Sequence, residues 1–192
     1  IFKSIVRTAA ARNGLTADFS PKPLKDKAGS GMHVNFAVRC RSGEDCMSMA
    51  IAGIMDKIEG ITAFLNPCPD SYERLGGSKA PGYVSWSSQN RSQLIRIPAA
   101  EGEFKRAELR SPDPEANPYL AFALLIYAGL EGIEKKMQLP ECADINLFSA
   151  PAQVLAKFRR LPENLEAAKT AALNCSLVRE RLPEELINIY CR

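Results

Sequence analysis

The sequence predicts an α+β fold, in which a mostly antiparallel sheet packs against helices and the C-terminal part is helical. Short stretches that alternate apolar and polar side chains lie near positions 15, 33, 83, 95 and 106, and helical patterns separate them at irregular intervals. From residue 116 onward the helical pattern dominates, and prolines at positions 151, 162 and 183 divide it into short pieces. We therefore expect a sheet-bearing part over residues 1–115 and a helical part over residues 116–192.

The composition excludes several classes of partner. Lys and Arg number 25 and Asp and Glu number 22, so the net charge of the 192 residues is +3. This charge is too small and too dispersed to favour nucleic acid or a membrane surface as the main partner. The sequence contains neither an apolar run of about 18 residues nor a leader pattern, so we expect no membrane span and no secretion.

The cysteines and the single histidine argue against a zinc site. The six cysteines stand at positions 40, 46, 68, 142, 175 and 191, and none forms a close CxxC pair. His33 is the one histidine that could join them. We therefore expect reduced thiols in a cytoplasmic protein.

The first elements follow from local patterns. Apolar residues recur at helical spacing over residues 2–10, and Gly14 is a suitable stop. Residues 15–20 are a strand candidate, and the loop after them contains two glycines around Ser30 that allow a ligand to approach the backbone. The next strand, residues 32–38, alternates between an apolar face and a face that carries His33.

The middle of the chain combines two helices with a long loop. Residues 44–59 carry an apolar stripe that Gly60 would close. Residues 64–89 are rich in Pro, Gly and Ser, which indicates a functional loop that leads into a strand over residues 83–88. Asn117 followed by proline predicts the cap of a long buried helix over residues 119–137.

Residues 104–110 form the most informative strand candidate. A period of two puts Lys105, Ala107 and Leu109 on one face and a charged set, Arg106, Glu108 and Arg110, on the other. A carboxylate between two guanidinium groups stays ionised and can ligate a hard cation. The guanidinium groups suit phosphate or carboxylate oxygens. The alternative is a solvated edge with ordinary ion pairs.

Several short sequence motifs resemble those of the glutamine synthetase catalytic domain. They are NRS at residues 90–92, IRIP at 95–98, RAELRSPDP at 106–114 and ANPYLAFALL at 116–125, joined by GSGMH at 29–33 and SYERL at 71–75. Their common order and spacing make the resemblance more specific than any single motif. It implies a curved, mostly antiparallel sheet, and it implies that residues 1–192 are the C-terminal part of that domain, since the chain begins at Ile1 without the family's earlier segments.

The resemblance also implies roles for individual residues. It assigns catalytic roles to Arg91 and Arg74, cofactor binding to Arg96, Arg106 and Asn35, substrate binding to Gly29, Arg74 and Arg110, and metal binding to His33 and Glu108. On spacing alone, His33 would more often be a structural residue. Family members often have Asn where Ala28 stands and a second His where Asn35 stands.

The implied reaction joins glutamate and ammonia into glutamine through γ-glutamyl phosphate, with ATP and Mg²⁺ or Mn²⁺, in a homo-oligomer. The fragment would be inactive alone, because the family's further acidic metal ligands lie outside it. Lys79 stands where the family commonly has a Glu that helps deprotonate ammonium, and a cation there would repel ammonium. Two alternatives therefore stay open: a ligase for another amine, and a non-catalytic homologue that binds nucleotide or amino acid.

Overall fold

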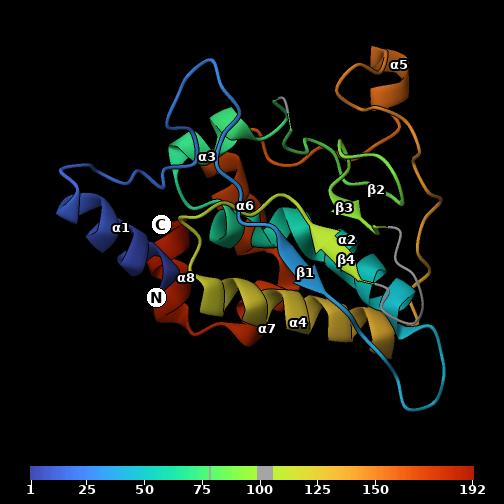
Figure 1. Cartoon of the computed structure of the whole chain (residues 1–192). Coiled ribbons are helices and arrows are strands. Elements are labelled where there is room, and N and C mark those ends of the chain that lie inside the picture. The colour runs from blue at the N-terminus through green and yellow to red at the C-terminus, as the bar shows by residue number, and fades with distance from the viewer. Residues whose placement is uncertain (78, 99–105) are drawn as a thin grey trace.

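The computed structural model describes residues 1–77, 79–98 and 106–192 (Figure 1). Helices and strands follow one another in an α+β arrangement, as predicted. In chain order they are α1 (Phe2–Arg12), β1 (Val34–Phe36), α2 (Cys46–Leu65), α3 (Pro69–Arg74), β2 (Trp86–Ser87), β3 (Ile95–Arg96), β4 (Ala107–Leu109), α4 (Pro118–Glu134), α5 (Ala152–Leu155), α6 (Leu165–Asn174), α7 (Ser176–Arg181) and α8 (Glu184–Cys191).

The sheet is small and mostly antiparallel, as expected. Its strand order is β1-β4-β3-β2, with antiparallel pairing of β4 to both β1 and β3 and parallel pairing of β3 to β2. Glu108 of β4 stands in register between Asn35 of β1 and Arg96 of β3. Because register partners share a sheet face, these three side chains form a polar row across the sheet.

The opposite face of the sheet contributes to the core. Ala107 and Leu109 of β4 are fully buried, in one cluster with apolar residues of α2 and α4. Figure 1 shows α4 running beneath β1 and β4, with α2 behind them. The two helices approach closely, since a Cβ built on Gly53 of α2 would lie 2.7 Å from the backbone nitrogen of Gly132 of α4. This two-sided strand agrees with the predicted alternation: apolar side chains face the helices and charged ones face away.

Two sequence expectations about element boundaries were wrong. Residues 15–20 form no strand, and their contacts include a local turn in which Ser20 N donates to Asp18 Oδ1. Gly60 does not end α2, which continues to Leu65. It is internal because the fully buried Ile61 and Phe64 extend the apolar face of the helix. A Cβ at residue 60 would lie 2.5 Å from Cβ of Cys175, which explains why a glycine stands there.

The remaining boundaries shorten the predicted elements. The strand expected over residues 83–88 is reduced to β2, and the strand expected over residues 104–110 is observed as β4, with residues 104 and 105 outside the described part of the chain. Asn117 caps α4, as predicted, because its Oδ1 accepts hydrogen bonds from the backbone N–H groups of Tyr119 and Leu120.

Within the described residues, no helix is long and apolar enough to cross a membrane.

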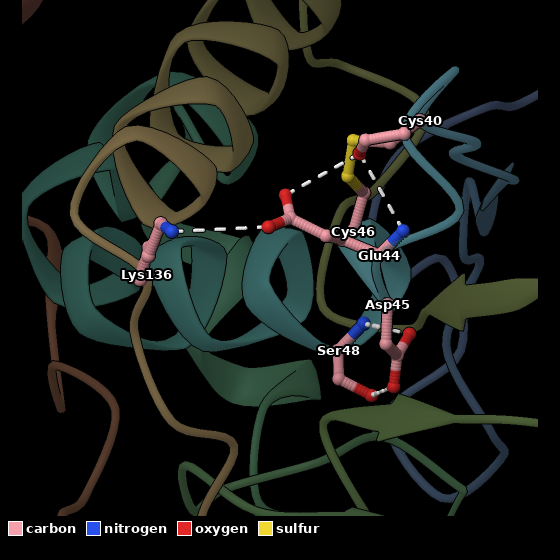
Figure 2. Close-up of a disulfide and its surroundings, with 7 residues drawn as sticks. Cys40, Glu44, Asp45, Cys46, Ser48 and Lys136 are labelled. Carbon is pink, nitrogen blue, oxygen red and sulfur yellow. Dashed lines mark hydrogen bonds and ion pairs between the residues drawn. A yellow bond between two sulfur atoms is a disulfide. The ribbon is translucent and has the colours of Figure 1, made fainter.

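The expectation of reduced thiols was wrong for two cysteines. Cys40 and Cys46 form a disulfide that closes the loop between β1 and α2 (Figure 2). Their Cα atoms lie 5.8 Å apart, which is within the bridging range. Glu44 in this loop pairs with Lys136 just beyond α4, at 3.7 Å. The other four cysteines are free thiols.

Candidate active site

Glu108 is the centre of the polar row on the sheet. Its Oε1 lies 2.7 Å from Nδ1 of His33, the residue just before β1, and 3.4 Å from Nη1 of Arg110. Its Oε2 accepts a hydrogen bond from Nη1 of Arg96 at 3.1 Å. Strand pairing brings these groups together, because Arg96 is the register partner of Glu108 and Arg110 follows it by two positions. The carboxylate is therefore held by three basic side chains.

The electrostatics keep this carboxylate ionised. Burial raises the pKa of Glu108, but the His33 hydrogen bond and the charges of Arg110 and Arg96 outweigh burial, so its pKa lies below the ordinary value. For His33, burial and the charge of Arg110 lower the pKa despite the opposing effect of Glu108. At neutral pH, the pair is thus a carboxylate and a neutral imidazole.

The protonation states define which histidine nitrogen is free. An ionised carboxylate can only accept, so Nδ1 of His33 donates to Glu108 and Nε2 carries the lone pair. A Cβ on Gly31 would lie 3.2 Å from this Nε2, so the glycine keeps the approach to it open. A metal on Nε2 would leave Glu108 as the carboxylate that orients the imidazole, whereas a metal shared by both residues would replace the Nδ1–Oε1 hydrogen bond.

The donors at this point fit a hard divalent cation only in part. His33 and Glu108 supply one nitrogen and carboxylate oxygens, whereas Mg²⁺ takes about six ligands, mostly oxygens of water, carboxylate and phosphate. The described residues contain no group of three or more His, Cys, Asp or Glu side chains that could hold a metal. These two residues could therefore hold a metal only together with ligands from elsewhere.

A cavity of about 550 Å³ opens over the charged row. The described residues that line it are Ala28, Gly29, Gly31, His33, Arg74, Lys79, Ala80, Arg91, Arg96, Glu108, Arg110 and Phe148. Among these, five are Lys or Arg and one is a carboxylate, which is already paired. Such a cavity attracts anions such as phosphate and carboxylate groups.

Arg74 lies at the end of α3 and is only 4% exposed. Its guanidinium donates to two backbone carbonyls, with Nη1 2.7 Å from O of Ser111 and Nη2 3.1 Å from O of Arg110. A Cβ on Gly29 would lie 2.8 Å from Cγ of Arg74, so the glycine allows the loop to pass over this side chain. Arg74 thus reaches the cavity while it holds the chain that follows β4.

Lys79 lies at the cavity in a left-handed backbone conformation, with φ of 76°. Its carbonyl oxygen accepts a hydrogen bond from Nη2 of Arg110 at 3.3 Å. Non-glycine residues rarely adopt this conformation, and such residues cluster at functional sites. The Arg110 side chain therefore links the loop of Lys79 to the carboxylate of Glu108.

The structure does not bring every candidate residue to the cavity. Asn35 shares the sheet face of Glu108 but lines an apolar groove between β1 and α4 instead. Arg106 is exposed and is not among the lining residues. Conversely, Phe148 lines the cavity although it lies in the helical part, which sequence reasoning treated as structural. The local sequence around Phe148 holds no signal for this, because the segment before it is bound to a distant part of the chain, with Gln93 donating to the carbonyls of Ala143 and Ile145.

Comparison with known proteins identifies the family. The family described as "Glutamine synthetase, catalytic domain" matches residues 1–192. The chain belongs to the glutamine synthetase family. It is 41% identical over 205 residues to the glutamine synthetase of Methanosarcina mazei, covering 98% of this chain and 46% of that protein. It is 38% identical over 201 residues to the enzyme of Thermus thermophilus, covering 96% of this chain and 45% of that one.

Solved structures of glutamine synthetase type share the fold. A structure described as a GmaS/ADP complex superposes with a TM-score of 0.81 at 30% identity, covering 93% of this chain and 45% of that chain. An apo GmaS structure gives a TM-score of 0.78 at 31% identity, with 93% and 44% covered. The chain therefore spans less than half the length of the glutamine synthetase relatives it matches.

Proposed function

We propose that the full-length protein carrying this chain is an ATP-dependent ligase that makes glutamine from glutamate and ammonia through γ-glutamyl phosphate. The observation that carries the proposal is the cationic cavity around the Glu108–His33 pair, in a chain of the glutamine synthetase family. A carboxylate must be activated before it forms an amide at neutral pH. Phosphorylation activates it, provided that basic groups disperse the negative charge of the phosphoryl group during transfer.

The proposed roles divide the cavity into three regions. Arg91 and Arg96 bind the transferring phosphoryl group, while Arg74, Arg110 and the backbone at Gly29 hold glutamate. His33 and Glu108 ligate Mg²⁺ or Mn²⁺, which when bound would disperse the phosphate charge. Arg106 and Asn35 lie away from the cavity and would contact the outer part of ATP.

The chain would be one piece of this machinery. Residues 1–192 are proposed as the C-terminal part of the catalytic domain, with residues 1–115 bearing the site and residues 116–192 supporting it. The fragment would be inactive alone, because His33 and Glu108 cannot complete a metal site. The full-length protein is proposed to form a homo-oligomer. A cytoplasmic location is proposed from the family and not from the cysteines, because Cys40 and Cys46 form a disulfide.

A second candidate function is a glutamate–amine ligase that uses a different amine. The observation that favours it is Lys79, an exposed cation on the cavity lining. An ammonium ion approaching this side chain meets a like charge, which disfavours ammonium relative to a neutral or anionic acceptor.

The test is phosphate release by the full-length protein with ATP, L-glutamate and Mg²⁺, in the presence of ammonium or a panel of amines. Arg91→Gln should reduce turnover at least about 100-fold, since it removes a charge opposite the phosphoryl group. Arg12→Gln, which removes an exposed arginine at the end of α1, is the matched control and should have no effect. Nucleotide or glutamate binding without phosphate release under any condition would instead identify a non-catalytic homologue.

A further inference from the structure

Three segments of the chain meet at one carbonyl oxygen below the cavity. O of Ser111, two residues after β4, accepts a hydrogen bond from Nη1 of Arg74 at 2.7 Å and another from Nδ2 of Asn66 at 2.9 Å. Asn66 is the C-cap of α2, and Arg74 is the last residue of α3. The position of the Arg74 guanidinium is thus tied to the end of the longest helix.

Asp113 also belongs to this junction. Its Oδ2 accepts a second hydrogen bond from Nδ2 of Asn66 at 2.9 Å, and its Oδ1 accepts one from the backbone N–H of Glu115 at 2.9 Å. Both Asn66 and Asp113 are fully buried. Burial lowers the pKa of Arg74, and the negative charge of Asp113 opposes this effect. The carboxylate is therefore the counter-charge that helps keep a buried guanidinium ionised.

The junction extends to the groups that face the cavity. Nη2 of Arg74 donates to O of Arg110 at 3.1 Å, and the Arg110 side chain pairs with Glu108 and with the carbonyl of Lys79. A shift of Ser111 would therefore move two of the cavity's arginines together. Neither Asn66 nor Asp113 lines the cavity, so any effect on substrate must pass through these arginines.

We propose that Asn66 and Asp113 are positioning residues that orient Arg74 and Arg110 for the carboxylate of the substrate. The proposal rests on the function proposed above and adds two residues to it. An amide at position 66 can donate to Ser111 and Asp113 at once. An apolar residue there would remove the donor to Oδ2 of Asp113 and would leave O of Ser111 with the Arg74 hydrogen bond alone of the two. Asn66 and Asp113 would act by fixing the positions of the two arginines, because a misplacement of about 1 Å can reduce turnover about 100-fold.

The test separates positioning from simple support of the fold. In the full-length protein, Asp113→Asn keeps the side-chain shape but removes the charge beside Arg74. It should raise the KM for L-glutamate about tenfold and leave the KM for ATP within about twofold. Thr62→Val is the matched control. Thr62 is fully buried in α2, the helix that Asn66 caps, donates only to O of Ile58 among the described residues, and does not line the cavity. It should lower the melting temperature and leave both KM values unchanged.

A double-mutant cycle tests whether Asn66 acts through Arg74. Asn66→Asp and Arg74→Lys should each raise the glutamate KM, and the double variant should be no worse than the poorer single variant. Additive effects, or equal changes in the KM values for glutamate and ATP, would overturn the positioning role.

Binding of L-glutamate by titration calorimetry distinguishes this proposal from the ligase proposal. If the native protein shows no turnover with any amine but Asp113→Asn still weakens glutamate binding about tenfold, the ligase proposal fails and positioning stands. If the native protein binds glutamate and the variant binds it equally well, the positioning role is wrong. A native protein that neither turns over nor binds glutamate overturns both.

Discussion

Nδ1 of His33 lies 2.7 Å from Oε1 of Glu108, so this pair joins the start of β1 to the middle of β4. The pair is part of the candidate site and also part of the fold, since it links two neighbouring strands. Its protonation should therefore be visible in the stability of the protein as well as in ligand binding.

The first prediction is that stability declines with acid in two steps. The pKa of His33 is lowered in the folded state, so the unfolded state takes up a proton first and stability falls as pH drops below 6.5. The pKa of Glu108 is also lowered, so a second loss begins below 4.5. Chemical denaturation at a series of pH values measures both steps.

His33→Gln should remove the upper step and diminish the lower one, because the His33 hydrogen bond is the largest of the effects that lower the pKa of Glu108. His33 is the single histidine of residues 1–192, so no other imidazole of this chain contributes to the upper step. An upper step that persists in this variant would show that the His33–Glu108 pair is not its origin.

The second prediction concerns the crossing of α2 and α4. A Cβ on Gly132 would lie 2.3 Å from O of Met49 and 2.8 Å from Cα of Gly53, both in α2. Gly132→Ala should therefore force the helices apart and cost about 1–3 kcal/mol of unfolding free energy. Gly129→Ala is the matched control, because its Cβ would meet Cβ of Ala50 at an ordinary 3.5 Å. The control should be neutral or slightly stabilising, since alanine favours a helix, and equal losses in both variants would contradict the packing argument.

Local patterns predicted the elements better than their ends. The cap at Asn117 and the two-sided character of β4 depend on neighbouring residues, so the sequence predicts them directly. Asn66 and Pro67 mark the true end of α2 locally, whereas the close approach of Cys175 to Gly60 depends on residues far along the chain and no local signal marks it.

The candidate site divides in the same way. Sequence motifs and strand alternation indicated that His33, Glu108 and Arg110 belong to one charged site. The fold brings these residues within hydrogen-bonding or ion-pairing distance. The contribution of Asn66 could not be predicted, because its hydrogen bond spans 45 residues to a backbone carbonyl that any residue type provides. The same holds for Phe148, which reaches the cavity only through tertiary packing.

The third prediction concerns the disulfide in Figure 2. Alkylation of the unfolded, non-reduced protein should label four cysteines, and alkylation after reduction should label all six. Reduction should lower the unfolding free energy by about 2 kcal/mol, because the bridge restricts the unfolded chain over a short loop. Cys40→Ser should show this loss without reductant and should not respond to reductant further. Six labelled cysteines without reduction would show that the bridge does not form.

The fourth prediction concerns the acceptor amine. Lys79 is one of the residues that line a cavity which also holds four arginines among its described residues. Lys79→Glu replaces a group that repels ammonium with one that attracts it and can accept its proton. Under the second candidate function, phosphate release with ATP and L-glutamate should increase about tenfold or more with ammonium, and not with a neutral or anionic amine. Lys157→Glu makes the same charge change at an exposed position away from the cavity and should have no effect.

Lys79→Gln separates loss of repulsion from gain of a base, because it removes the cation without adding a proton acceptor. Strong turnover of the native protein with ammonium, together with little change in Lys79→Glu, would show that Lys79 leaves ammonia as the ordinary acceptor.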